Sequence, residues 1–209
     1  MNPDESKKLS WIPKTRISLR LSLFFFTILI VWIGWYVLRT QAQQACVKEI
    51  IESRGGVIYS HRYVDGKYTP NPPLPGPWFV RESLGLDYVD HVVVVDFSSK
   101  EIAKLPKLSR LPKLRSLWIR DTQISDLTPA SSLTRLEKLW ISDTKVTDLS
   151  PIAKCKNLKW LNASRTNIED LSPLFELPNL EQLVIVEHKI PPDELQRFRL
   201  ARPDCKIAE

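Results

Sequence analysis

The stretch LEKLWISDTKVTDLSPIAKCKN, residues 136–157, decides the fold, because the chain repeats its pattern on both sides. Residues 114–135 read LRSLWIRDTQISDLTPASSLTR, and residues 158–179 read LKWLNASRTNIEDLSPLFELPN. Apolar residues therefore recur at intervals of 22 positions. The recurring columns are Val92, Leu114, Leu136, Leu158 and Leu180; Val95, Leu117, Leu139, Leu161 and Leu183; Phe97, Ile119, Ile141, Ala163 and Ile185; and Ile102, Ile124, Val146, Ile168 and Ile190.

The pattern L-x-x-L-x-L-x-x-T-x-I at a fixed period is the signature of leucine-rich repeats. Alternate residues of LWISDT point to opposite faces of a short strand, so one set enters the core and the other lines a concave sheet. A single coil cannot bury its own apolar edge, so neighbouring coils stack. We therefore predict an α/β fold, a leucine-rich repeat solenoid of about five coils with a parallel concave sheet. Ala163 stands where Leu or Ile belongs and thins the core of its coil.

Polar residues repeat with the same period and predict how the turns are held. The threonine column is expected to bond backbone groups of each turn. The Ser/Thr-Pro pairs place a capping hydroxyl before a proline, which predicts a helical turn on the convex side. The aspartate column is expected to accept bonds from the same turns, with a metal site as the alternative. These sets are Thr122, Thr144 and Thr166; Thr128-Pro129, Ser150-Pro151 and Ser172-Pro173; and Asp126, Asp148 and Asp170.

A second feature is the apolar run LSLFFFTILIVWIGWYVL, from Leu21 to Leu38, which has no charged residue. A helix of this length spans roughly 27 Å, close to the hydrocarbon thickness of a bilayer. Trp32, Trp35 and Tyr36 fit an interfacial belt. The following RTQAQQAC has no Ala-x-Ala, which favours an uncleaved anchor over a signal peptide. The lipoprotein alternative, cleavage before Cys46, lacks the usual apolar residue three positions earlier.

The distribution of Lys and Arg predicts the orientation of this anchor. Five basic residues precede the run and three follow it within a similar distance, which favours a cytoplasmic N-terminus and an exported C-terminal body. They are Lys7, Lys8, Lys14, Arg16 and Arg20 on one side, and Arg39, Lys48 and Arg54 on the other. We therefore predict a single-pass membrane protein.

Residues 39–91 are expected to cover the open start of the solenoid. Residues 40–54 have helical apolar spacing, and Gly55-Gly56 would end that helix. The alternating VIYSHRYV predicts a strand, and DGK a hairpin turn. A proline-rich connector follows, and WFVRESLG resumes as a short helix after Pro77. The predicted domains are a cytoplasmic tail (1–16), a transmembrane helix (17–38), this cap and connector (39–91), the repeats (92–190) and a C-terminal cap (191–209).

The three cysteines form neither a zinc framework nor a disulfide scaffold, because their number is odd and no C-x-x-C occurs. Cys155 is in register with Leu133 and Leu177 and is predicted to be a small buried hydrophobe. Cys205 is expected to be buried, with Ile207, by the C-terminal tail. An exported Cys46 could pair with Cys46 of a second chain, which is a hypothesis for dimerisation.

At this point the residues resemble a known family. The repeats are similar to the 22-residue repeats of internalin-type bacterial proteins, with I-x-D-L-S-P-L in the return segment. The whole chain resembles membrane-anchored leucine-rich repeat proteins of planctomycete bacteria, in EIIESRGGVIY, PGPWFVRESLG, HVVVVDFS and RPDCKI. This resemblance covers roughly residues 45–207 and implies a role in protein–protein interaction.

The concave strand positions are the predicted carriers of function. Three tryptophans on one exposed face favour partner binding, since Trp and Arg dominate interface hot spots. The alternative is that the rings only stack on one another, with Arg120 across them. The predicted partner-binding residues are Trp118, Arg120, Lys138, Trp140, Trp160 and Asn162. The other outward positions are Asp96, Ser98, Ser116, Ser142, Ser164, Gln182, Val184 and Val186, bordered by Asp121, Asp143, Arg165 and Glu187.

We predict a non-catalytic module that binds an unidentified protein on the exported side. A glycan or cell-wall ligand is one alternative, because flat aromatic faces stack on sugars, and an envelope spacer without a ligand is another. His61, His91 and His188 are scattered and no hydrolase, metalloprotease or phosphate-loop motif occurs, so we predict no enzyme, cofactor or metal. The net charge of +6 is spread along the chain, which disfavours nucleic acid.

Overall fold

The computed structural model describes residues 19–64, 67–70, 73–79, 82, 90–97 and 101–209. Its contacts divide the chain into two compact units, Met1–Leu38 and Arg39–Glu209. The predicted cytoplasmic tail and Ser98 lie outside the described residues. The predicted helix at 78–85 is described only at Trp78, Phe79 and Glu82, which are helical.

One helix, α1 (Leu19–Glu52), contains both the predicted membrane span and the predicted helix that follows it. Within the first unit its large apolar side chains are exposed, from Leu21 and Leu23 through Phe26 to Leu38. Among the described residues α1 is the one helix long and apolar enough to cross a membrane, and a signal sequence near an N-terminus satisfies the same criteria.

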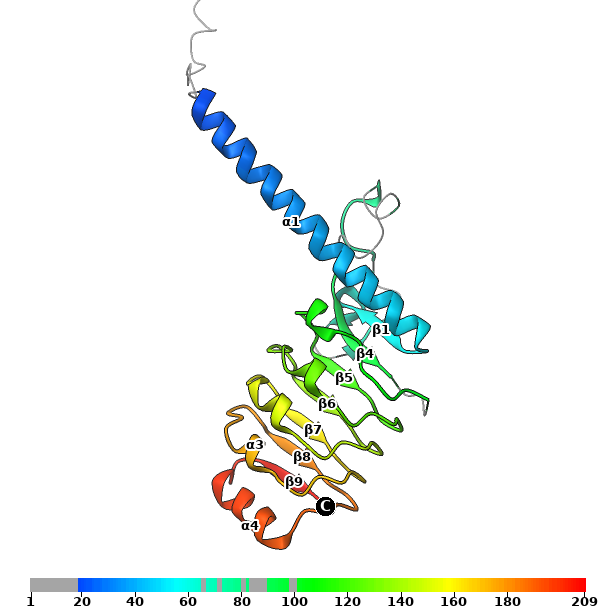
Figure 1. Ribbon diagram of the computed structural model, residues 1–209, viewed down its shortest axis with the longest axis vertical. Coiled ribbons are helices and arrows are strands. Elements are labelled where there is room, and N and C mark those ends of the chain that lie inside the picture. Colours follow the sequence, from blue (N-terminus) through cyan, green and yellow to red (C-terminus); the bar gives the residue numbers. More distant parts are fainter. Residues whose placement is uncertain (1–18, 65–66, 71–72, 80–81, 83–89, 98–100) are drawn as a thin grey trace, which may run out of the picture. The chain divides into compact units, whose positions relative to one another are not determined.

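The second unit is built on a seven-stranded sheet in the order β1-β4-β5-β6-β7-β8-β9 (Figure 1). Strands β4 to β9 run parallel, and β1 pairs antiparallel with β4. The strands are β1 (Gly56–Tyr59), β4 (Val92–Asp96), β5 (Ser116–Trp118), β6 (Lys138–Trp140), β7 (Trp160–Asn162), β8 (Gln182–Val184) and β9 (Lys206–Ala208). The repeat prediction is confirmed, because β4 to β8 coincide with the 22-residue pattern.

Short helical turns return the chain on the other side of the coils (Figure 1). They are η4 (Leu108–Arg110), η5 (Thr128–Ala130), η6 (Ser150–Lys154) and α3 (Ser172–Phe175), followed by the longer α4 (Pro192–Ala201). The apolar columns enclosed between strands and turns form one buried cluster, in which Leu117, Leu139 and Leu161 are fully buried. Each such side chain contributes about 1.5–3 kcal/mol through its removal from water. Ala163 is buried in that cluster as well.

The threonine column bonds the backbone as predicted. The hydroxyls of Thr122, Thr144 and Thr166 donate to the carbonyl oxygens three residues earlier, at 2.8, 2.7 and 2.7 Å. The residue before each threonine has a left-handed backbone, with φ of 56° at Asp121, 57° at Asp143 and 52° at Arg165. The buried hydroxyl therefore satisfies the main chain where each coil turns away from its strand.

The aspartate column holds the start of each helical turn, as predicted. The backbone N–H groups of Thr128, Ser150 and Ser172 donate to the carboxylates two residues earlier at 2.7, 2.7 and 2.8 Å. The predicted capping by the Ser/Thr hydroxyls is wrong, since none of these turns has a side-chain cap from its N-cap residue. The N-cap residue of each turn is the leucine before the pair, and the side chains of Thr128 and Ser172 hydrogen-bond to Asp126 and Asp170.

The start of the solenoid departs from the sequence prediction in its strands. The predicted strand over VIYSHRYV is interrupted by η2 (Ser60–Arg62), between β1 and β2 (Tyr63–Val64). The reason is Asp90, which accepts hydrogen bonds from the Ser60 hydroxyl, the His61 N–H and the His61 ring. The hairpin prediction is confirmed by the antiparallel pairing of β2 with β3 (Lys67–Tyr68).

The C-terminal segment folds back onto the last coil. In α4, Glu194 accepts a hydrogen bond from the Leu171 N–H at 3.2 Å. Arg202 donates to the carbonyl oxygens of Leu177 and Leu180. The predicted extended tail is the strand β9, and Cys205 beside it is buried as predicted. These contacts satisfy main-chain groups that the last coil would otherwise leave open.

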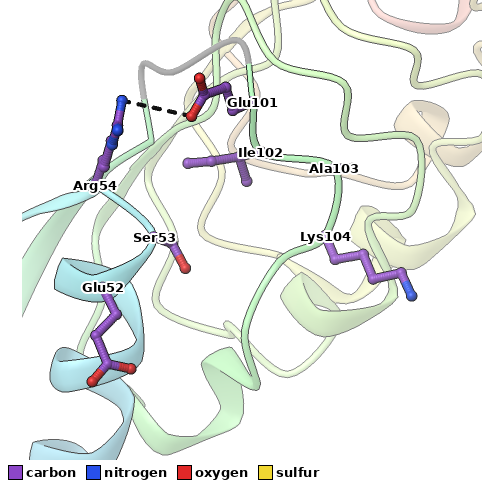
Figure 2. A pocket seen from close by; sticks show the side chains of 7 residues that line it. All are labelled: Glu52, Ser53, Arg54, Glu101, Ile102, Ala103 and Lys104. Carbon is purple, nitrogen blue, oxygen red and sulfur yellow. Dashed lines mark ion pairs between the residues drawn. The ribbon is translucent and has the colours of Figure 1, made fainter.

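The end of α1 packs closely on the first coil. Arg54 is left-handed with a φ of 58°, and the N–H groups of Arg54 and Gly55 donate back to Ile51 and Ile50 at 2.9 and 2.8 Å. Figure 2 shows this end beside residues 101–104, with Arg54 and Glu101 joined by an ion pair of 3.6 Å. The helix therefore ends at the left-handed backbone of Arg54. Gly55 is needed because Ile50 and Phe97 lie too close to it for a side chain.

We predict that Gly55→Ala destabilises the fold, because a Cβ there would lie 2.8 Å from the Ile50 Cγ2 and 2.9 Å from the Phe97 Cδ1. Overpacking of this kind costs about 1–3 kcal/mol in the free energy of unfolding. Urea denaturation of both chains measures it. Gly56→Ala is the matched control, since nothing lies within 4 Å of a Cβ at Gly56. Equal midpoints for the two variants would contradict the packing.

We also predict acid sensitivity from the turn aspartates. Hydrogen bonds from the side chains and backbones of Thr128 and Ser172 lower the pKa values of Asp126 and Asp170. Because the pKa of each carboxyl is lower in the folded than in the unfolded state, the ionised carboxyl stabilises the fold at pH values above the unfolded-state pKa of about 3.9. This stabilisation is lost as the pH falls through the folded-state pKa. Denaturation between neutral pH and pH below about 3 should show a shallower loss for Asp126→Asn/Asp170→Asn than for wild type. Asp204→Asn, an exposed control, should follow wild type.

Candidate functional site

The strand register arranges the concave side chains in rows that cross the coils. One row contains Val94, Ser116, Lys138, Trp160 and Gln182. The next row, two residues along each strand, contains Asp96, Trp118, Trp140, Asn162 and Val184. Backbones in a row lie about 4.8 Å apart, so neighbouring side chains touch. The structure thus brings five of the six predicted binding residues onto one face of β5, β6 and β7, and Arg120 lies beside Trp118 and Trp140 beyond the end of β5.

Trp118, Trp140 and Trp160, here called the aromatic strip, are in contact with one another. The ring centroids of Trp118 and Trp140 lie 5.1 Å apart at 72°, and those of Trp140 and Trp160 lie 3.9 Å apart at 42°. Trp140 therefore packs against a ring in its own row and a ring in the other row. All three side chains are half-buried.

A hollow of about 90 Å³ lies beside the strip, lined by Trp118, Arg120 and Trp140. Arg120 is exposed at the end of β5. The indole Nε1 of Trp118 is buried and has no hydrogen-bond partner in the part of the chain that is described. An indole N–H normally finds an acceptor when buried, so this donor is a polar contact that the free chain leaves unmade.

A larger hollow of about 410 Å³ adjoins the other side of the strip. It combines two predicted residues with charged residues from the neighbouring coils and the tail. Its lining residues are Lys138, Lys159, Trp160, Glu181, Gln182, Asp204 and Lys206. Sequence reasoning missed Asp204 and Lys206, because their place beside β8 depends on β9 joining the sheet.

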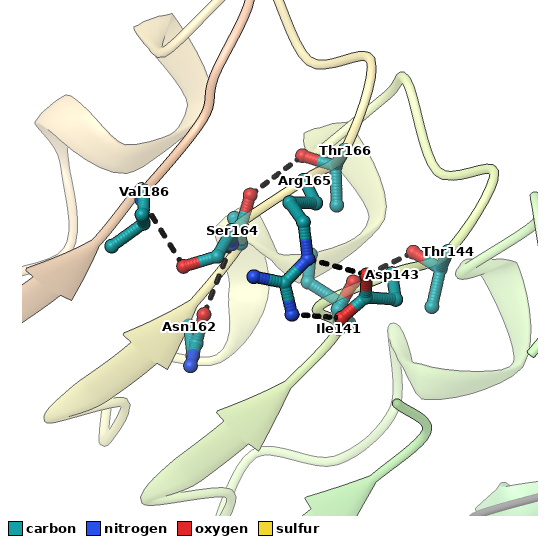
Figure 3. Close-up of polar contacts among 9 residues, drawn as sticks. Ile141, Asp143, Thr144, Asn162, Ser164, Arg165, Thr166 and Val186 are labelled. Carbon is teal, nitrogen blue, oxygen red and sulfur yellow. Dashed lines mark hydrogen bonds and ion pairs between the residues drawn. The ribbon is translucent and has the colours of Figure 1, made fainter. Parts of the chain in front are cut away.

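Asn162 is fixed by the main chain that follows it. Its side-chain oxygen accepts the Ser164 N–H at 3.0 Å, and the Ser164 hydroxyl accepts the Val186 N–H at 3.1 Å. Figure 3 shows the Asn162 nitrogen pointing away from these bonds. The amide is thus held in one orientation beside the aromatic strip.

The border of the face is held by a charge pair between adjacent coils. The Arg165 guanidinium bonds both oxygens of Asp143, with Nε to Oδ1 at 2.5 Å and Nη2 to Oδ2 at 2.6 Å (Figure 3). A bidentate pair of this kind has a defined geometry. It keeps Arg165 along the edge of the face.

The serines predicted on this face do not form part of its surface. Ser116, Ser142 and Ser164 are only 1%, 7% and 4% exposed. Ser116 lies between Val94 and Lys138 in its row, and the Ser164 hydroxyl accepts the Val186 N–H. The prediction that these three serines are accessible on the concave face is therefore wrong. The accessible face is formed by the larger side chains.

The buried polar residues near the start of the repeats share one carboxylate, that of Asp90. Ser60, His61 and His91 all donate to Asp90, whose pKa is lowered because these hydrogen bonds outweigh the opposing effect of burial. Ser60 and His61 thus bind different oxygens of the same carboxylate, Oδ1 and Oδ2. No group of three His, Cys, Asp or Glu among the described residues could hold a metal ion.

The cysteines are buried. Cys155 is fully buried, as predicted, and burial raises the pKa of its thiol to about 11. Cys46 is also fully buried, with Sγ 3.8 Å from the Lys107 carbonyl oxygen, and burial, with Glu49, raises its pKa to about 11. The hypothesis of a Cys46–Cys46 disulfide is therefore corrected, since this thiol is inaccessible to a second chain.

Comparison with known proteins identifies the repeats. Residues 112–154 match the model of a family described as leucine-rich repeats in two copies. These coils are leucine-rich repeats. A search of curated protein sequences found no match. Leucine-rich repeat proteins generally mediate protein–protein interaction and are typically binding scaffolds.

Solved structures with this fold come from several organisms. An internalin, InlF, from Listeria monocytogenes is 20% identical with a TM-score of 0.42, covering 62% of this chain and 46% of its own. A leucine-rich repeat protein from Leptospira interrogans is 22% identical with a TM-score of 0.46, and the match covers 68% of this chain and 41% of that protein. A chain of the SNF/U2A′ complex of Drosophila melanogaster is 18% identical with a TM-score of 0.46, and the match covers 55% of this chain and 71% of that one. The chain thus spans less than half the length of the first two proteins.

We predict that Trp140→Ala destabilises the fold, because Trp140 contacts both other rings of the strip. Each aromatic pair is worth about 0.5–1.5 kcal/mol beyond area burial, so the free energy of unfolding should fall by about 1–3 kcal/mol. Urea denaturation measures the change. Trp78→Ala removes a 67% exposed indole and should change stability by less than about 0.5 kcal/mol. A Trp140→Ala effect no larger than this control would show that the ring contacts contribute little.

Proposed function

We propose that this chain is a membrane-anchored, non-catalytic leucine-rich repeat module that binds a protein partner through the concave face of its repeats. The observation that carries the proposal is the half-buried aromatic strip of Trp118, Trp140 and Trp160, on the side-chain face of β5 to β7. Large rigid rings provide contact area at low entropic cost, and Trp and Arg are the residues most enriched at interface hot spots.

The surroundings of the strip support a protein partner. Arg120, Lys138 and Asn162 surround apolar rings with polar groups, as in an interface with an apolar centre and a polar rim. The rings lie at 72° and 42° to one another, so they form no row of parallel open faces of the kind that sugar rings stack on. This geometry favours a protein over a glycan.

Anchoring by residues 21–38 completes the proposal. Exposed apolar residues along this part of α1, among them Phe24, Phe25 and Trp32, would be costly to leave in water, and a bilayer would cover them. With the basic residues before the run, the C-terminal repeats would lie on the exported side of a bacterial membrane. We propose the planctomycete type of membrane-anchored repeat protein for the whole chain, in line with its sequence resemblance.

We predict that crosslinking in intact cells captures a partner with the tagged wild-type chain and not with Trp118→Ala/Trp140→Ala. Purified partner should then bind wild type saturably, with at least about tenfold loss for the variant, because two hot-spot residues are removed. Trp78→Ala/Phe79→Ala is the matched control, since it removes two exposed aromatic residues outside the strip. Arg120→Glu/Lys138→Glu leaves the rings in place and tests the rim if the alanine variant unfolds.

The alternatives give different results in the same experiment. Competition by soluble cell-wall glycan would indicate a glycan ligand, and equal capture by all variants would remove the strip from the binding surface. The absence of any saturable partner would leave the envelope-spacer alternative. Protease added to intact cells should degrade the repeats if they are exported, and protection in cells with a permeable outer layer would contradict the proposed topology.

A further inference from the structure

A second hollow, away from the aromatic strip, is lined by basic residues. Its volume is about 430 Å³, within the range of ligand-binding pockets. Lys113, Arg115 and Arg135 line it together with His91, Tyr63 and Ser60. It lies where the first coils enter their strands, and none of the predicted partner-binding residues lines it.

The repeat ladder concentrates the charge of this hollow. His91, Lys113 and Arg135 are each 22 residues apart, one in each of three successive coils, and are here called the cationic column. The ladder beside them is continuous, since the Arg115 N–H donates to the Val93 carbonyl oxygen at 2.8 Å. Successive members of the column therefore occupy equivalent positions before the strands of adjacent coils. The fold places basic side chains next to one another.

These charges are only partly compensated. Arg115 pairs with Glu137 at 3.5 Å. Lys113 and Arg135 make no ion pair within the described ranges. The Asp90 carboxylate, which accepts hydrogen bonds from the Ser60 hydroxyl, the His61 ring and N–H, and the His91 N–H, offsets only one of these two charges. The hollow therefore keeps an excess of positive charge.

His91 reports this excess. Burial lowers the pKa of His91 most, and the positive charge of Lys113 lowers it further. The Asp90 charge opposes this change, but Arg39 and Arg135 add to the lowering, so the pKa is below its ordinary value. The imidazole is thus a neutral donor and acceptor beside fixed cations at neutral pH. An anion in the hollow would favour the imidazolium and raise the pKa of His91.

We propose that this hollow binds a phosphate group. Ammonium and guanidinium groups with the His91 ring supply N–H donors from three coils, which fits the several acceptor oxygens of a tetrahedral oxyanion better than the two of a carboxylate. The volume exceeds that of phosphate alone and leaves room for the organic part of a phosphate ester. The ester could be a soluble metabolite or a lipid headgroup, which carry the same chemistry.

The test is a titration of the full chain in uncharged detergent with inorganic phosphate, at constant ionic strength set with chloride. The readout is the NMR pKa of His91, assigned with His91→Gln and compared with those of His61 and His188. We expect a saturable rise at His91 alone. Lys113→Gln and Arg135→Gln should each weaken binding by about tenfold, as loss of a charge-assisted hydrogen bond predicts. Thermal unfolding and the amide spectrum establish that each variant is folded.

Lys145→Gln is the matched control, because it removes the same charge from an exposed side chain that does not line the hollow. The absence of a saturable shift at His91, or equal loss of binding in Lys145→Gln, would overturn the proposal. Full chain in bilayer discs of phosphatidylcholine, with or without phosphatidylglycerol, distinguishes the two sources. A shift caused by phosphatidylglycerol without added phosphate would identify a lipid headgroup, and a shift that requires added phosphate would identify a soluble ester.

Discussion

The hydrogen-bonded ladder between coils is the constraint on which the rest of the second unit depends. It aligns Val94, Ser116, Lys138 and Trp160 in one row and keeps that register from β4 to β8. Each strand residue of the repeats therefore lies beside the one 22 positions further along the chain. A column of leucines becomes a buried seam, and a column of threonines becomes a line of backbone bonds. The same rule turns a column of tryptophans or basic residues into a surface.

A ladder of this kind must end, and each end satisfies its open main-chain groups differently. At the start, β1 pairs antiparallel with β4, and Gly55 lets the end of α1 approach Phe97. At the finish, β9 pairs with β8 while Arg202 donates to carbonyl oxygens of the last coil. In both places a segment outside the repeats donates or accepts where a further coil would have done so. We infer that these segments act as the caps expected for a solenoid.

The repeats, their register and the concave face of β5 to β7 could be predicted because they follow from a period that is visible in the sequence. Contacts between side chains of different coils, or between the repeats and the segments outside them, could not be predicted in this way. The burial of Ser116 depends on the size of its neighbours in other coils, and the break in the strand at Ser60 depends on Asp90, 30 residues away. The left-handed backbone at Arg54 could not be predicted, because Gly55 and Gly56, which follow it, adopt that conformation more readily than arginine does. Cys46 looked accessible because only the fold places Lys107 against it.

The charges of adjacent columns show why the two surfaces differ in character. In one column Arg115 is followed by Glu137, and in another Asp143 is followed by Arg165, so opposite charges pair across coils. The cationic column breaks this alternation, since Lys113 and Arg135 follow one another with the same sign. Neighbouring like charges repel one another, and more strongly beside a half-buried wall than in bulk water. The alternating columns offset this repulsion by pairing within the chain, and an anion bound in the hollow would do the same for Lys113 and Arg135.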